Sequence, residues 1–86
     1  MASLYTLPTS IKEWSCNDVR TFLTALGFNF APKVFLAEKI DGIALLLLRR
    51  EEILYSFGLL AGPALKICGI VEQLRQDFYV DMSDPD

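Results

Sequence analysis

The sequence predicts an all-α fold, a small five-helix bundle with a long C-terminal helix. Apolar residues recur along the chain at spacings of three and four, which is the period of an amphipathic helix. A length of 86 residues allows one small domain. Residues that favour helix starts precede or open the apolar segments at four places: Ser15, Pro32, Asp41 and Pro63.

Composition divides the chain into three segments. Residues 1–13 show no sustained period and are expected to form an N-terminal arm, whose apolar residues can lie across the bundle. Residues 14–80 are expected to form the helical domain. Residues 81–86 form an acidic tail, which we expect to be disordered because it offers almost nothing to bury.

The charge of the folded part is balanced. The net charge of −3 arises in the acidic tail, since the eight basic residues are matched by eight acidic residues between Lys12 and Asp77. No basic field for nucleic acid is therefore evident. The hydrophobic content of 52% exceeds what the core of so small a domain can hold, so clustered exposed apolar side chains are expected to mark an interface.

The first helix is expected from about Cys16 to Ala25. Ser15 is a good N-cap, and Asp18 stands three residues later in the capping-box position. Gly27 is expected to end this helix. Trp14 directly precedes the cap and is expected to pack onto the helix as a hydrophobic staple.

The second and third helices lead into a run of four leucines. Pro32 suits the first turn of the second helix because its missing N–H would have no partner there. Asp41 is expected to cap the short third helix. Leu47 lies about 200° from Leu45 around a helix. It is therefore expected to point away from the other leucines of the run.

The fourth helix is expected to carry Glu51 and Glu52 in its first turn, where the helix dipole favours negative charge. Arg49 precedes it in place of a capping hydroxyl, so this start is expected to be less well capped. Together, the helices are expected to bury seven core residues: Phe35, Leu46, Leu48, Ile53, Phe57, Ile67 and Val71.

The fifth helix is expected to start at Pro63 and to be the longest. One side of it carries an apolar stripe formed by Ile67, Val71, Leu74 and Phe78. Leu65 lies about 160° from that stripe. It is expected to be exposed at the front of the helix, although it could instead fold back on Leu59 or Leu60 and be partly core.

Catalytic and metal-binding patterns are absent from the sequence. The chain has no histidine, which removes the commonest general base. Its two cysteines make neither a disulfide framework nor a metal-ligand spacing. The glutamate pair is typical of a solvated helix surface, and no apolar run approaches the ~18 residues of a membrane span. We expect no enzyme, no catalytic residue, no cofactor, no metal, no small-molecule substrate and no membrane partner.

The order of several motifs resembles the sterile alpha motif domain, closest to the type found in Polycomb-group and MBT-repeat chromatin proteins. The matching pieces are Trp14-Ser15 with Asp18-Val19, Ile40-Asp41-Gly42, the leucine run Leu45 to Leu48, Gly58, and Gly62-Pro63-Ala64-Leu65-Lys66-Ile67. The resemblance covers roughly residues 14–74.

The resemblance implies a protein–protein interaction module with two different binding surfaces. Its members often join the front of the last helix of one copy to a patch around the middle helices of the next. Here the helix-end surface would comprise Leu60, Ala61, Leu65 and Lys66. The mid-domain surface would comprise Glu38, Asp41, Leu47, Glu51 and Glu52. The implied setting is intracellular and nuclear, in a chromatin-associated transcriptional repressor assembly.

Two departures from the family pattern keep the identity of the partner open. Polycomb-type members usually read lysine-leucine before Gly62, whereas this chain reads Leu60-Ala61, and Lys39 stands where those relatives tend to have an acid. The partner can therefore be the same chain or a different sterile alpha motif domain. Binding of an RNA hairpin is a further alternative. It needs several basic residues on one face around the last helix, and near the start of that helix only Lys66 is found. A monomeric adaptor is the third.

Overall fold

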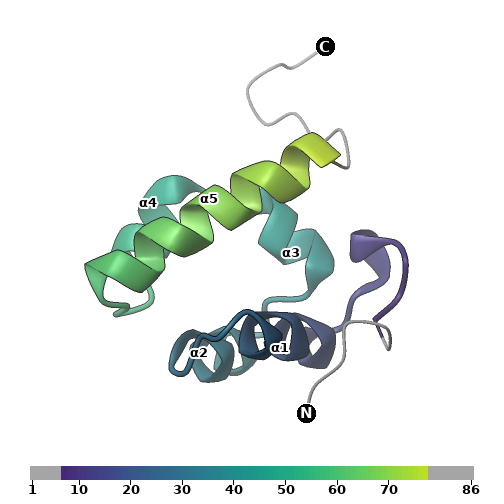
Figure 1. The fold of residues 1–86 in the computed structure, drawn as a ribbon, viewed down its shortest axis with the longest axis horizontal. Coiled ribbons are helices and arrows are strands. Elements are labelled where there is room, and N and C mark those ends of the chain that lie inside the picture. The colour runs from purple at the N-terminus through teal and green to yellow at the C-terminus, as the bar shows by residue number, and fades with distance from the viewer. Residues whose placement is uncertain (1–6, 78–86) are drawn as a thin grey trace. The chain divides into compact units, whose positions relative to one another are not determined.

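The computed structural model describes residues 7–77, in which the chain forms five α-helices, one short 3-10 helix and no strand (Figure 1). The elements are η2 (Ile11–Glu13), α1 (Cys16–Ala25), α2 (Ala31–Ala37), α3 (Gly42–Leu47), α4 (Arg50–Tyr55) and α5 (Ala61–Asp77). The predicted all-α fold with a long last helix is confirmed. The chain divides into two compact units, residues 1–45 and 46–86, which are described in turn.

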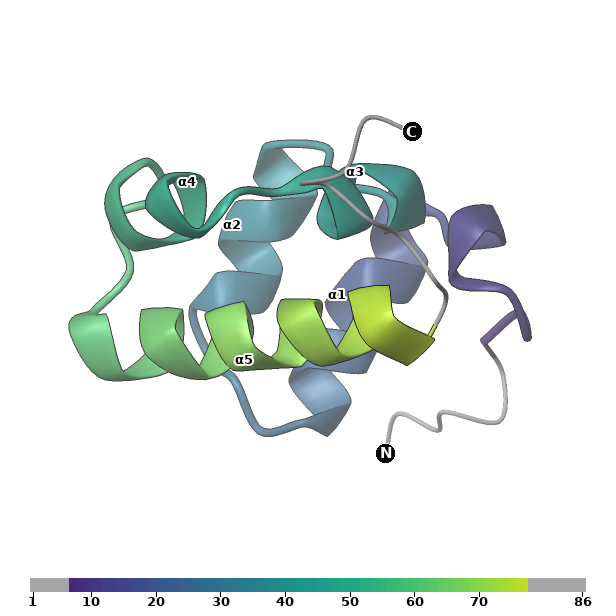
Figure 2. The same ribbon diagram turned by 90° about the horizontal axis from the view of Figure 1, so that it is seen from above.

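In the first unit, α1 has the predicted bounds because its capping box forms. The Asp18 backbone N–H donates to Ser15 Oγ at 3.1 Å, and the Ser15 backbone N–H donates to Asp18 Oδ2 at 2.9 Å. Gly27 follows the C-cap with a φ of 97°, a conformation that glycine adopts without steric cost. From there the chain turns into α2, which packs against α1 (Figure 2).

The described part of the N-terminal arm packs against the rest of the first unit. The side chain of Ile11 is fully buried. The Trp14 ring lies 5.0 Å from the Phe22 ring, and Trp14 Nε1 donates to the Pro8 carbonyl at 2.9 Å. Trp14 thus packs onto α1 as expected of a staple. The apolar residues of the arm within positions 1–6, which were also expected to lie across the bundle, are outside the described residues.

The start of α3 depends on a close approach between two backbone segments of the first unit. The Ala44 N–H donates to Asp41 Oδ1 at 2.9 Å, so Asp41 caps α3 as predicted. The Gly42 N–H donates to the Trp14 carbonyl at 3.0 Å, and a Cβ atom on Gly42 would lie 1.7 Å from the Ile11 carbonyl oxygen. A glycine is required here because any side chain would collide with backbone.

In the second unit, α4 lies beside the first turns of α5 (Figures 1 and 2). Six of the seven predicted core residues of the chain are buried, but Phe57 is only half-buried. Phe57 stands four residues after Ile53, a spacing that puts both on the inner face of one helix, but α4 ends at Tyr55 and does not reach Phe57. The buried apolar residues of this unit are Leu46, Leu48, Ile53, Ala64, Ile67, Cys68 and Val71.

Two helix starts in the second unit differ from the prediction in detail. The Arg49 N–H at the start of α4 donates to Glu52 Oε1 at 2.8 Å, so a carboxylate caps a helix that lacks a capping hydroxyl. α5 begins at Ala61, two residues before Pro63. Pro63 is tolerated at the third position because the first N–H groups of a helix have no intrahelical acceptor.

Some expectations concern residues outside 7–77. Phe78 of the apolar stripe and the acidic tail over 81–86 lie outside the described residues. Within them, Ile67 and Val71 of the stripe are buried and Leu74 is half-buried. None of the helices described is both long and apolar enough to cross a membrane.

The leucine run provides a matched test of the core. Leu48→Ala is expected to lower the free energy of unfolding by about 2–5 kcal/mol because it leaves a cavity, and Ile67→Ala is expected to do the same. Leu47→Ala is the control, since its side chain is 50% exposed against 6% for Leu48. Denaturant unfolding of the three variants measures the difference. Equal losses for Leu47→Ala and Leu48→Ala would contradict the assignment.

The two cysteines are expected to differ in reactivity. Both are free thiols, Cys16 half-buried and Cys68 buried, and burial raises the pKa of the Cys68 thiol. A raised pKa reduces the thiolate that reacts with maleimide at neutral pH. Cys16 should therefore be alkylated first in the native protein, and Cys68 only as the protein unfolds. Mass spectrometry of Cys16→Ser and Cys68→Ser proteins over time measures both rates, and faster labelling at Cys68 would refute the assignment.

Candidate protein-binding surfaces

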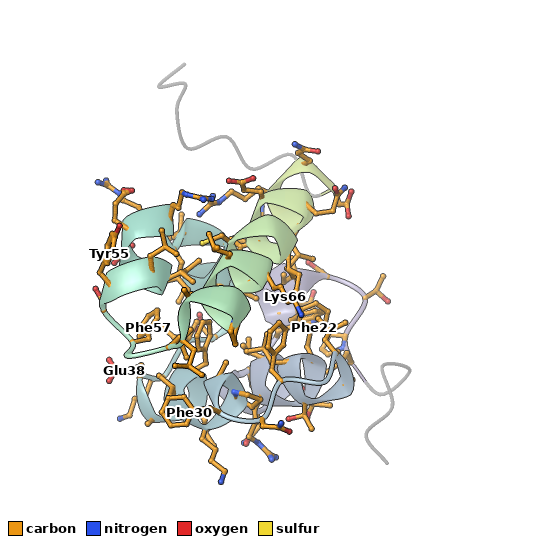
Figure 3. All side chains as sticks on the ribbon, turned by 60° about the vertical axis from the view of Figure 1, so that its left-hand side comes forward. Phe22, Phe30, Glu38, Tyr55, Phe57 and Lys66 are labelled. Atoms are coloured by element: carbon orange, nitrogen blue, oxygen red, sulfur yellow. The ribbon has the colours of Figure 1, made fainter. Side chains whose placement is uncertain are left out.

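The helix-end surface lies wholly in the second unit and is exposed. Leu60 precedes α5 and is 78% exposed, and Leu65 is 49% exposed. Ala61 and Leu65 stand four residues apart in α5 and so share one face. Lys66 is also exposed on α5, as Figure 3 shows. The prediction that Leu65 is exposed is confirmed, and a patch of apolar atoms carries one cation at its edge.

The electrostatic character of the helix-end surface is positive. The first turn of α5 contains no acidic residue. Backbone N–H groups without intrahelical acceptors and the helix dipole place partial positive charge there. Lys66 adds a full positive charge about one turn further along. This surface is therefore suited to an apolar partner surface that carries carboxylates.

Three residues of the mid-domain surface lie in the second unit and are exposed. Leu47 ends α3 and is 50% exposed, while Glu51 and Glu52 stand in the first turn of α4. Glu52 uses one carboxylate oxygen to cap its own helix. Glu51 is not used by that cap. Leu47 with Glu51 thus offers an apolar side chain close in sequence to a free carboxylate.

The other two predicted residues lie in the first unit. Glu38 is the C-cap residue of α2 and is exposed (Figure 3). Asp41 is half-buried and its carboxylate accepts the Ala44 N–H. The Asp41 carboxylate thus has a structural role in capping α3, whereas the Glu38 carboxylate faces solvent.

Several apolar residues are exposed although the sequence did not predict it. Tyr55 ends α4 and is 80% exposed (Figure 3). It stands four residues after Glu51, and this helical spacing could have indicated that the two share a face. In the first unit, Leu26, Phe30 and Ile43 are 45%, 58% and 51% exposed. The apolar surface of the chain is thus larger than the predicted patches.

Metal-ligand geometry is not found in the part of the chain that the structure describes. No group of three or more cysteine, aspartate or glutamate residues between 7 and 77 is placed to hold a metal ion. The exposed apolar patches with charged edges remain the features of these residues that fit a binding role.

Comparison with known proteins gives relatives for most of the chain. It is 35% identical over 79 residues to the mouse protein named sterile alpha motif domain-containing protein 1, which is 92% of this chain and 15% of that protein. It is 39% identical over 67 residues to the Drosophila melanogaster Polyhomeotic-proximal chromatin protein, which is 77% of this chain and 4% of that protein. The chain therefore spans a small part of the length of these curated relatives.

A solved structure and a family model agree with these relatives. The structure described as the hetero SAM domain structure of Ph and Scm matches with a TM-score of 0.65 and 38% identity. The match covers 74% of this chain and 98% of the matched chain. The model of the SAM domain, or sterile alpha motif, matches residues 12–75. The chain belongs to the sterile alpha motif domain family.

Proposed function

We propose that this chain is a protein–protein interaction module that binds another sterile alpha motif domain head to tail. The observation that carries the proposal is the exposure of two leucines, Leu65 at 49% next to the exposed Lys66 and Leu47 at 50% near the exposed Glu51. The similarity to a structure of two different sterile alpha motif domains supports a partner of the same family. That partner is a second copy of this chain or the corresponding domain of another protein.

Charge complementarity supports the pairing of the two surfaces. Lys66 beside Leu65 would meet Glu51 near Leu47, and a partner that presented like charge would be rejected. The helix-end and mid-domain surfaces are different patches of one chain, so their contact is heterologous. A heterologous contact that does not close by rotation repeats as an open helical filament.

The names of the relatives support a proposed cellular setting. The Drosophila relative is named a chromatin protein. A chain with the same domain would act in a chromatin-associated transcriptional repressor assembly in the nucleus. Fluorescence microscopy of the tagged full-length protein tests this setting, and exclusion from the nucleus would contradict it.

The Leu65→Arg variant is expected to remain folded. Arginine has high helix propensity, and the position is half-exposed. Its melting temperature should stay within about 3 °C of the parent, since surface substitutions are usually within about 0.5 kcal/mol. Ile67→Arg is the matched control two residues away and should unfold the domain, because it buries an unpaired charge. Unfolding of Leu65→Arg would show instead that Leu65 belongs to the core.

The two surfaces can be tested by complementation. Leu65→Arg is expected to abolish association by placing a charge in an apolar contact, and Glu51→Arg should weaken it about tenfold or more by reversing the charge. An equimolar mixture should form dimers and no longer species, because each variant keeps one intact surface. Sedimentation velocity at several concentrations measures this.

Each outcome of the complementation test has a clear reading. If the parent chain associates and the mixture does not form dimers, the head-to-tail pairing is wrong. If the parent chain is monomeric at high concentration, self-association is excluded. The same two variants are then tested against the sterile alpha motif domains of its relatives. If the chain binds none of these domains, the proposed function is contradicted.

A further inference from the structure

Arg75 reaches from α5 to the backbone on either side of Leu47. Arg75 Nε donates to the Leu46 carbonyl oxygen at 2.7 Å, and an Nη2 hydrogen of the same guanidinium is donated to the Leu48 carbonyl oxygen. Leu46 and Leu48 are buried, whereas the side chain between them is 50% exposed. All of these residues belong to the second unit.

The carbonyls that Arg75 binds lie at the end of a short helix. α3 ends at Leu47, and the last four carbonyls of a helix have no intrahelical donor. The last turn of α3 contains no basic residue. A cation near a helix C-terminus is favoured by the helix dipole and can hydrogen-bond the last carbonyls. Arg75 therefore supplies from α5 the cap that α3 lacks.

The planar shape of the guanidinium fixes the orientation of the two carbonyls that it binds. Its donors are held in one plane with fixed geometry, unlike the single rotating ammonium of lysine. Two carbonyls bound to one guanidinium are fixed relative to each other. The peptide units around Leu47 are thereby fixed, and with them the direction in which its side chain leaves the backbone.

The other polar contacts described between α5 and the segment around Leu47 are weaker. Arg50 Nη1 lies 4.0 Å from Glu72 Oε1, and both side chains are more than half exposed. Exposed ion pairs of this kind contribute little to stability. The Cys68 thiol lies 3.9 Å from the Arg50 carbonyl oxygen, and a thiol is a weak donor. Of the polar contacts described for residues 7–77, those of Arg75 thus make the strongest link from α5 to the backbone at Leu47.

We propose that Arg75 is a positioning residue for the mid-domain surface, which sets its affinity for a partner by holding the backbone on both sides of Leu47. The inference rests on the proposed function, since it assumes that Leu47 contacts the partner. Arg75 itself follows Leu65 by ten residues, about 15 Å along the helix. The helix-end surface should therefore be insensitive to its replacement.

The Leu65→Arg and Glu51→Arg backgrounds separate the two surfaces. Arg75→Met keeps an apolar stem and removes the donors. When added to the Leu65→Arg chain, which retains only the mid-domain surface, it should weaken binding to the Glu51→Arg partner about tenfold or more. When added to the Glu51→Arg chain, it should leave binding to the Leu65→Arg partner within about twofold. Isothermal titration calorimetry measures both affinities.

Two further variants complete the experiment. Gln76→Met introduces the same side chain at the adjacent exposed position and should change neither affinity. Arg75→Lys keeps the charge but not the planar pair of donors, so it should weaken the mid-domain surface alone, by less than Arg75→Met. If Arg75→Met fails to fold in a thermal melt, the Arg75→Lys arms decide the question.

The outcomes distinguish this inference from the proposed function. Equal losses in both backgrounds would mean that Arg75 only stabilises the fold, and no loss in either would mean that Leu47 is positioned without it. Either result overturns the inference while the parent pair still binds. If Leu65→Arg and Glu51→Arg chains without the Arg75 change fail to bind each other, self-association is refuted, and the same Arg75→Met arms are measured against a sterile alpha motif domain of a relative that binds the parent chain. If no such domain binds, the proposed function is refuted and the inference with it.

Discussion

Four consecutive leucines, three of them in the last turn of a short helix and the fourth directly after it, cannot all be buried on one side. Successive side chains of a helix are separated by about 100°, and here Leu45, Leu46 and Leu48 are 1%, 2% and 6% exposed whereas Leu47 is 50% exposed. The three buried leucines belong to the apolar core. Leu47 is exposed as a consequence of that burial, and its apolar side chain lies shortly before the start of α4, which carries Glu51 and Glu52.

The short helices of this domain depend on polar groups at their ends. α3 and α4 have six residues each, which is far below the length at which a helix is stable alone in water. Asp41 caps the start of α3, and Glu52 accepts the Arg49 N–H at the start of α4. The other end of α3 is bound by Arg75. These contacts hold in place the segment that displays Leu47 and Glu51.

The two candidate surfaces have the same composition, an exposed leucine with a charged residue nearby. Each has a half-exposed leucine at or near a helix end, and each has charge nearby, Lys66 on α5 and Glu51 on α4. An apolar anchor with a charged edge gives affinity through burial and specificity through charge. This arrangement suits association between two domains of the same family, since one chain provides both halves of the contact.

The sequence by itself determined the features that depend on neighbours within about four residues. The bounds of α1, the cap at Asp41 and the exposure of Leu47 and Leu65 follow from capping residues and helical spacing, and all were predicted. Phe57 was assigned to the core wrongly, because the pattern alone does not show that α4 ends at Tyr55. The start of α5 was displaced by two residues for a similar reason, since Pro63 is compatible with any position in a first turn.

Only the tertiary structure decided the contacts between distant residues. Arg75 is separated by 29 and 27 residues from the two carbonyls that it binds, and Gly42 is required because the backbone of Ile11 approaches it closely. Local propensity contains no information about such partners, because they depend on how the chain returns to itself. The residues of the proposed binding surfaces were thus chosen from the sequence, whereas the contacts of Arg75 on either side of Leu47 became visible only in the folded chain.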